Sequence, residues 1–146
     1  MKSRLLHEQD GRKTFILIFD KGDEVIEGII NFARENKLSA SYFTAIGAWS
    51  SALLGFFNRE TKSYVEIPVN EQVEVASMTG NISIADGAPR VHAHAVVSKK
   101  DGTCVGGHIL KAQVWPTTEL VVTESPIELH REPDEESGLS LIRICG

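Results

Sequence analysis

The pattern of apolar residues changes near residue 41, and this change limits the folds that are open to the chain. Between residues 23 and 36, apolar side chains recur at the spacing of one helical face. These residues are Val25, Ile29, Phe32 and Ala33. From Ser41 to His130 the chain shows short β-prone runs and no second long helical period. One helix packed on an antiparallel sheet is an α+β arrangement, and this is the predicted fold class.

Turn-forming dipeptides such as Asp101-Gly102 divide the β-rich region into separate strands. A buried strand at Thr14–Phe19 is expected to precede the helix. The predicted helix covers about residues 23–36, with Asp23 as its N-cap and Asn36 closing it in a left-handed conformation. The later strands are predicted at residues 42–46, 51–58, 63–67, 73–84, 90–98, 104–114 and 119–129.

The length of 146 residues fits one domain, which can bury a core without disulfides or a structural metal. An acidic segment at residues 132–138 predicts a solvated loop, and residues 139–144 offer a last strand. No segment has the length and hydropathy of a signal peptide or a membrane span. Cys104 and Cys145 lack the spacing of a disulfide scaffold or a zinc ribbon. We therefore expect a single domain over residues 1–146, no membrane partner and a cytoplasmic location.

Acidic residues outnumber basic ones by 20 to 15, which gives a formal charge of −5 at pH 7. Domains that bind nucleic acids usually carry a basic face whose lysines and arginines release counterions from phosphate. In this chain the basic residues are scattered singly or in pairs. The charge pattern therefore disfavours DNA as a partner.

Three histidines form the main chemical signal: His92 and His94 in one predicted strand, and His108 in the next. Side chains two residues apart in a strand point to the same face, with α-carbons about 6.5–7 Å apart. The rings of His92 and His94 could therefore reach one ion. Imidazole suits zinc, copper, nickel and iron, and three histidine nitrogens with one open position form a known zinc arrangement. The sequence therefore predicts His92, His94 and His108 as candidate metal ligands.

The position of His108 depends on the hairpin turn that joins the two strands. A three-residue loop at residues 100–102, a type I turn followed by a left-handed glycine, places His94 opposite His108. A two-residue turn at residues 101–102 instead sends His108 to the other face. A bulge at Gly106-Gly107 would again reverse the face of the sheet to which His108 points. Alternatively, these glycines would let another backbone or a ligand approach closely. The residues alone leave these arrangements open.

Other chemistry has weaker support in the sequence. The histidines could also be strand residues that form hydrogen bonds with their neighbours. Cys104 is expected to be a buried apolar thiol rather than a fourth ligand, because an extended strand separates it from His108 by about 13 Å. The glycines form no dinucleotide or Walker motif, and the serines form no nucleophile elbow. No general base is identifiable, so the sequence does not decide whether the protein is an enzyme.

Several segments together resemble the plants-and-prokaryotes-conserved (PPC) domain family over about residues 10–144. The segments are Thr44-Ala45-Ile46-Gly47-Ala48, Leu54-Gly55-Phe56-Phe57, Thr79-Gly80-Asn81-Ile82-Ser83, Asp86-Gly87-Ala88-Pro89-Arg90-Val91-His92-Ala93-His94 and Gly106-Gly107-His108-Ile109. The resemblance implies a compact α+β domain that assembles as a homotrimer. In prokaryotic members, it implies a stand-alone cytoplasmic protein whose His-x-His and Gly-Gly-His motifs supply metal ligands. These ligands map onto His92, His94 and His108.

The same family is often labelled as DNA-binding, because plant members join the domain to an AT-hook. This chain has no Arg-Gly-Arg-Pro hook, and Gly11-Arg12-Lys13 is a weak substitute. We therefore expect a homotrimer that binds a divalent transition metal, with zinc favoured, and that has room for a small-molecule ligand. A DNA-associated regulatory protein and a purely structural trimer are the alternatives.

Overall fold

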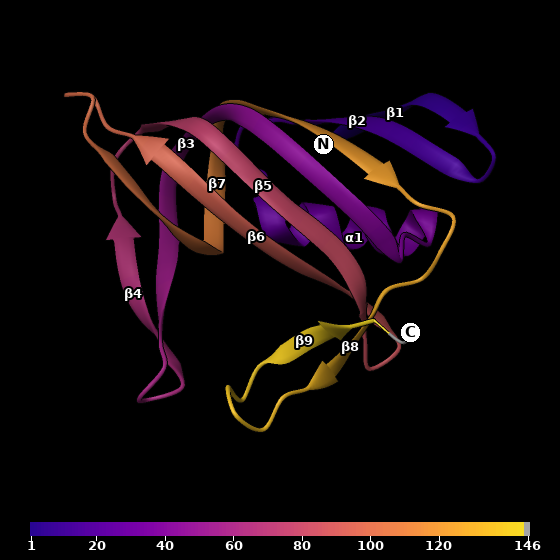
Figure 1. Cartoon of the computed structure of the whole chain (residues 1–146). Coiled ribbons are helices and arrows are strands. Elements are labelled where there is room, and N and C mark those ends of the chain that lie inside the picture. Colours follow the sequence, from indigo (N-terminus) through magenta and orange to yellow (C-terminus); the bar gives the residue numbers. More distant parts are fainter. Residues whose placement is uncertain (145–146) are drawn as a thin grey trace.

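The computed structural model describes residues 1–144, and it confirms an α+β domain with one helix against an antiparallel sheet (Figure 1). The elements are β1 Lys2–Gln9, β2 Arg12–Phe19, α1 Val25–Asn36, β3 Ala40–Asn58, β4 Ser63–Val69, β5 Val73–Ala85, β6 Ala88–Ser98, β7 Cys104–Glu124, β8 His130–Pro133 and β9 Ser140–Arg143. Within this range no helix is long and apolar enough to cross a membrane. Cys145 lies outside the described residues.

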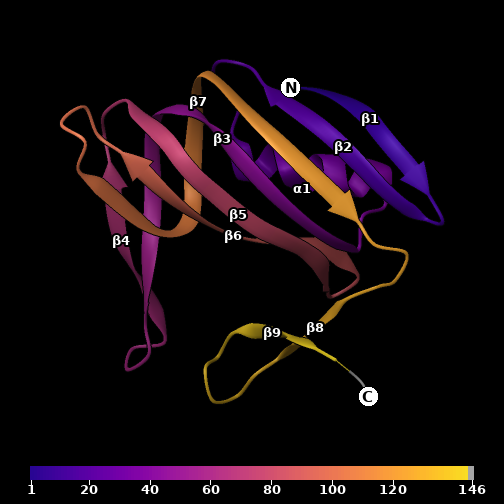
Figure 2. The ribbon, with the colours of Figure 1, turned by 45° about the horizontal axis from the view of Figure 1, so that its top comes forward.

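All nine strands belong to one sheet, in which β7 pairs with β2, β3 and β6. Strand β3 pairs with β5, β5 with β6, and β6 with β7, which pairs again with β3. The pairing path therefore returns to its starting strand, and the sheet curves strongly. Figure 2 shows β3 and β7 bending along their length, while the β8–β9 hairpin projects away from the helix.

The core lies between α1 and the sheet, as the helical spacing predicts. Val25, Ile29, Phe32 and Ala33 are all buried, so the helix presents its complete apolar face to the strands. Trp49 on β3 is fully buried, and its indole Nε1 donates a hydrogen bond of 3.0 Å to Thr118 Oγ1 on β7. These contacts join the helix and the two longest strands into one core.

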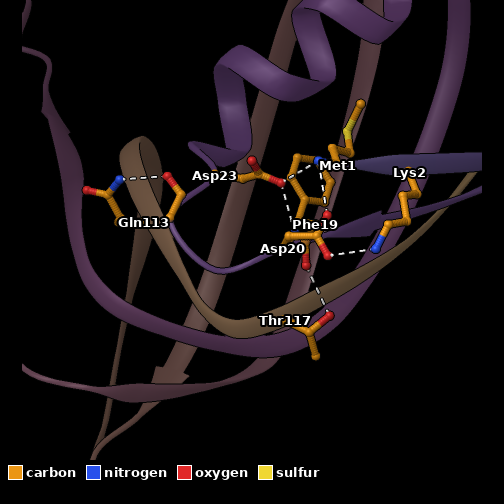
Figure 3. Close-up of polar contacts among 8 residues, drawn as sticks. Met1, Lys2, Phe19, Asp20, Asp23, Gln113 and Thr117 are labelled. Carbon is orange, nitrogen blue, oxygen red and sulfur yellow. Dashed lines mark hydrogen bonds and ion pairs between the residues drawn. The ribbon is translucent and has the colours of Figure 1, made fainter.

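The helix begins one residue later than the sequence predicts, because a different side chain caps it. Glu24 is the N-cap, and its carboxylate accepts a hydrogen bond of 2.6 Å from the Glu27 backbone nitrogen. Asp23, the expected cap, instead accepts a bond of 2.8 Å from the Asp20 backbone nitrogen. The Asp23 carboxylate also pairs with the Met1 amino group at 2.8 Å (Figure 3). The expected capping role of Asp23 is therefore wrong.

The C-terminal end of the helix also differs by one residue. Lys37, rather than Asn36, adopts the left-handed conformation, with φ of 55°. The Asn36 side chain instead donates a hydrogen bond of 3.0 Å to the Phe32 carbonyl.

Two pairs of predicted strands are each one continuous strand. The predicted strands at residues 42–46 and 51–58 belong to β3, and the ladder to its neighbours shifts register around Gly47. The predicted strands at residues 104–114 and 119–129 form β7, which ends at Glu124.

Strand β1 was not predicted, because all its side chains are exposed and show no alternation. The acidic loop is shorter than expected, because β8 extends to Pro133.

Glu124 connects the start of β3 to the end of β7. Its side chain is only 7% exposed and accepts hydrogen bonds from the backbone nitrogens of Ser39 and Ala40, at 2.8 and 3.2 Å. The Ser41 hydroxyl also donates to it. Removing this acceptor leaves buried donors without a partner, which costs more free energy than one exposed hydrogen bond contributes.

We predict that Glu124→Ala lowers the free energy of unfolding by about 2–3 kcal/mol, measured by urea denaturation at fixed protein concentration. Glu119→Ala is the matched control, since Glu119 is exposed on the same strand. It should change stability by no more than about 0.5 kcal/mol. Equal effects of the two variants would contradict the role given to Glu124.

Candidate metal centre

The β6–β7 hairpin adopts the three-residue loop, which was one of the alternatives that the sequence leaves open. The Lys99 backbone nitrogen donates to the Thr103 carbonyl at 2.8 Å, and Gly102 takes a φ of 84°. The ladder then places His94 directly opposite His108. Residues opposite each other in an antiparallel pair point to the same face, so both rings lie on one side of the sheet with His92.

The three imidazole rings form one compact cluster. The Nε2 atoms of His92 and His94 are 3.2 Å apart, and one ligand atom from each histidine lies within 4.8 Å of the others. Zinc–nitrogen bonds of 2.0–2.1 Å in a tetrahedral site place two ligand nitrogens about 3.3 Å apart. The first pair therefore already has the required separation, and His108 needs only a small movement. The structure brings together all three sequence-predicted ligands.

Glycines make room for the ring that covers His108. Tyr64 on β4 stacks on His108 with ring centroids 4.7 Å apart and an angle of 26° between the rings. Gly55 on β3 faces His108 across the ladder, and a β-carbon there would lie 2.7 Å from Tyr64 Cδ1. A β-carbon on Gly107 would lie 2.8 Å from the Gly55 carbonyl oxygen. Gly107 therefore permits the close approach of another backbone, which was one of the expected alternatives. The β6–β7 ladder has no bulge at Gly106-Gly107.

The surroundings of His92 and His108 favour neutral imidazoles. Burial lowers the pKa of His108 from 6.5 to about 4, and the nearby charges of His92 and His94 add to the effect. Burial also lowers the pKa of His92, with smaller effects from His94 and Arg131. Metal ions bind the neutral form of imidazole, so these groups need not lose a proton at pH 7 to become ligands.

One buried nitrogen supports a bound ion more directly. His108 Nδ1 is buried and has no hydrogen-bond partner within the described part of the chain. Burying a polar nitrogen without a partner costs free energy, and a bound group that interacts with this nitrogen would remove the cost. Three imidazoles are a donor set typical of zinc and related ions. The residues present therefore fit a divalent transition metal.

Several neighbours of the cluster were not found by sequence reasoning. Tyr64, Arg90 and Arg131 line, with His92 and His108, a cavity of about 280 Å³. Strand alternation could have identified Arg90, because it lies two residues before His92 on the same strand. Tyr64 and Arg131 come from distant strands, and no local pattern places them here.

Cys104 is exposed, so its expected burial is wrong. It lies at the first position of β7, beside the hairpin loop, where the ladder ends and no element covers it. It is not in the metal-ligand cluster, in agreement with the sequence expectation.

The fold and the site define a class of protein: a single α+β domain with a three-histidine cluster on a β-hairpin. The chain belongs to the Plants and Prokaryotes Conserved (PCC) domain family, whose model matches residues 6–126. This confirms the family resemblance identified from the sequence motifs. No curated protein matches the sequence.

Solved structures of the same fold carry different functional descriptions. A metal-containing protein from Archaeoglobus fulgidus is 35% identical, with a TM-score of 0.83, and the match covers 90% of this chain and 94% of that one. A plant- and prokaryote-conserved protein from Pyrococcus horikoshii is 27% identical, with a TM-score of 0.86, over 99% and 96% of the chains. A candidate DNA-binding protein from Ralstonia eutropha JMP134 is 29% identical, with a TM-score of 0.83, over 90% and 91%.

The low pKa of His108 predicts a pH dependence of stability in the metal-free protein. The unfolded chain takes up a proton near pH 6.5, whereas the folded chain resists protonation of His108 until about pH 4. The free energy of unfolding should therefore fall between these values as the pH decreases. The slope should be shallower in His108→Gln, measured by urea denaturation in EDTA.

The exposed His7 on β1 supplies the control for this prediction. His7→Gln should keep the slope of the wild type, because it removes an exposed imidazole and leaves His108 in place. The carboxyl groups that also titrate in this range are common to all three proteins. If His108→Gln and the wild type have the same slope, His108 is not held neutral by its surroundings.

Proposed function

We propose that this protein is a homotrimeric, metal-binding member of its family, with one divalent transition ion held by His92, His94 and His108. The observation that carries the proposal is the 3.2 Å separation of the His92 and His94 Nε2 atoms, with a third histidine within reach. The metal-containing relative from Archaeoglobus fulgidus supports the same assignment. Zinc is the favoured ion, since it accepts three imidazoles and keeps a fourth position for water or a ligand.

The bound ion would give the site a defined chemistry. With three protein ligands, a zinc ion has an open position and can polarise an oxygen ligand or lower the pKa of bound water toward about 7. The cavity beside His92 and His108 supplies access for a small molecule. We therefore propose that the site senses or acts on a small molecule.

The homotrimer has support from apolar side chains that the single chain leaves exposed. On β3 and β4, Phe56 and Val65 face each other and are 65% and 52% exposed. Nearer the start of β3, Tyr42 and Ile46 are 64% and 60% exposed on the face that α1 does not cover. Exposed apolar side chains grouped in this way are typical of a protein–protein interface. We propose that neighbouring copies of the chain cover it.

DNA binding is the weaker candidate function for this chain. A relative described as a candidate DNA-binding protein supports it, but the net charge of −5 opposes attraction to phosphate. Neutral imidazoles at His92 and His108 add no positive charge that would attract phosphate. We therefore retain the metal site as the proposed function.

We predict that untagged protein, stripped with EDTA and reloaded with zinc at neutral pH, holds one zinc ion per chain after dialysis, measured by mass spectrometry of the metal. His94→Ala should hold none, because it loses one of three ligands, yet should keep the β-rich circular dichroism spectrum. His7→Ala is the control and should bind as the wild type does. The proposed site would be overturned if the reloaded wild type held no zinc, or if His94→Ala and His7→Ala lost zinc equally.

We predict that the chain elutes as a trimer of about 48 kDa by light scattering, three times its mass of 16.0 kDa. Phe56→Asp should shift the mass toward the monomer, because it places a charge in an apolar interface. Ile127→Asp is the control, since Ile127 is 60% exposed in the segment after β7. A wild-type monomer at micromolar concentration would refute the trimer.

A further inference from the structure

Two arginines line a cavity beside the histidine cluster. The cavity of about 280 Å³ is lined by His92 and His108, by Arg90 and Arg131, and by apolar side chains of the β8–β9 hairpin. Leu139 and Leu141 contribute these apolar walls. The cavity thus combines two guanidinium groups, apolar surface and residues of the proposed metal site, and none of its lining residues within 1–144 carries a carboxylate.

Arg131 is held in place by neutral hydrogen-bond acceptors. Its Nε donates to Ser83 Oγ at 2.7 Å, its Nη1 to the Ser140 carbonyl at 2.8 Å, and its Nη2 to Asn81 Oδ1 at 2.8 Å. Asn81 lies directly opposite His92 in the β5–β6 ladder. The guanidinium is therefore fixed beside the histidine cluster. Because it has five N–H groups, two remain for a ligand.

Among the described residues, the two arginines have no carboxylate paired with them. Within residues 1–144, neither Arg90 nor Arg131 forms an ion pair. Arg131 is partly buried, and burial together with the nearby charge of Arg90 lowers its pKa. A partly buried guanidinium beside a second positive charge is unfavourable unless an anion offsets the charge.

We propose that this cavity binds a small organic carboxylate, with the carboxylate on Arg131 and Arg90 and the rest of the molecule directed toward the histidine cluster. A planar guanidinium binds a carboxylate through two parallel hydrogen bonds, and the leucine walls favour an organic ligand over an inorganic anion. The inference rests on the proposed function in one respect, because it takes the metal at the histidine cluster as the group on which the ligand would react. The arginines, however, do not depend on the ion.

The test uses the full-length protein in metal-free and zinc-loaded forms, with butyrate as the carboxylate probe. Binding is followed by NMR of the arginine Nε–H groups and the backbone amides. Butyramide has the same shape without the charge, and inorganic phosphate is the competing oxyanion. Arg90→Gln is the principal variant, since the Arg90 side chain is exposed and forms no hydrogen bond or ion pair within the described chain. Arg131→Gln is the second variant, and Arg34→Gln on α1 is the control.

We expect saturable shifts with butyrate in both forms and none with butyramide. Arg90→Gln and Arg131→Gln should each weaken binding by about tenfold or more, the usual effect of losing a charge-assisted hydrogen bond. Arg34→Gln should bind butyrate as the wild type does.

Equal shifts with butyramide, or unchanged affinity in both cavity variants, would overturn the proposal. Tighter binding of phosphate than of butyrate would replace the carboxylate with an inorganic anion and overturn the ligand class. Butyrate binding without zinc uptake would refute the metal site alone. Zinc uptake without butyrate binding would refute the carboxylate site alone.

Discussion

The turn between β6 and β7 determines whether the three histidines can act together. Gly102 adopts a left-handed conformation, and Asp101 Oδ1 accepts hydrogen bonds from the Thr103 backbone nitrogen and hydroxyl, at 2.9 and 2.6 Å. This loop fixes the pairing that places His94 opposite His108. A shift of one residue would send His108 to the other face of the sheet. The chemistry of the site thus depends on a local turn that lies outside it.

The surroundings of the cluster keep its groups in the states that ligand binding requires. Tyr64 covers His108, and burial holds the pKa of His108 at about 4, which leaves a neutral imidazole at physiological pH. On the other side of the cavity, Arg131 stays close to His92 through Asn81. Imidazole donors next to fixed positive charge suit a cation and an anion bound side by side. The metal and the carboxylate would then each offset the charge of the other.

The sequence predicts those parts of the protein that depend on local patterns. The helical face at Val25, Ile29, Phe32 and Ala33 and the shared face of His92 and His94 follow from residue spacing, and both are confirmed. The hairpin register was open, because two turn lengths suit the same residues. The continuity of β3 and β7 could not be predicted, since the register shifts that let them bend depend on pairing with neighbouring strands.

Residues that reach the site from distant strands mark the limit of sequence reasoning. Tyr64 lies on β4 and Arg131 on β8, and the pairing of β4 with β3 and of β8 with β5 brings them beside His108 and His92. Glu24 replaces Asp23 as the helix cap for a related reason. Asp23 accepts a hydrogen bond from the backbone of Asp20, three residues earlier, and pairs with the Met1 amino group, which is a tertiary contact. Local preferences are therefore overridden where tertiary contacts compete for the same side chain.

X-ray absorption at the zinc edge of the reloaded protein tests the central claim most directly, because it reports the atoms bound to the metal. The account predicts three imidazole nitrogens at about 2.0–2.1 Å and one further oxygen or nitrogen ligand, with no sulfur. Added butyrate should leave the imidazole scattering unchanged. A sulfur ligand, or fewer than three imidazoles, would contradict the assignment of His92, His94 and His108 as the metal centre.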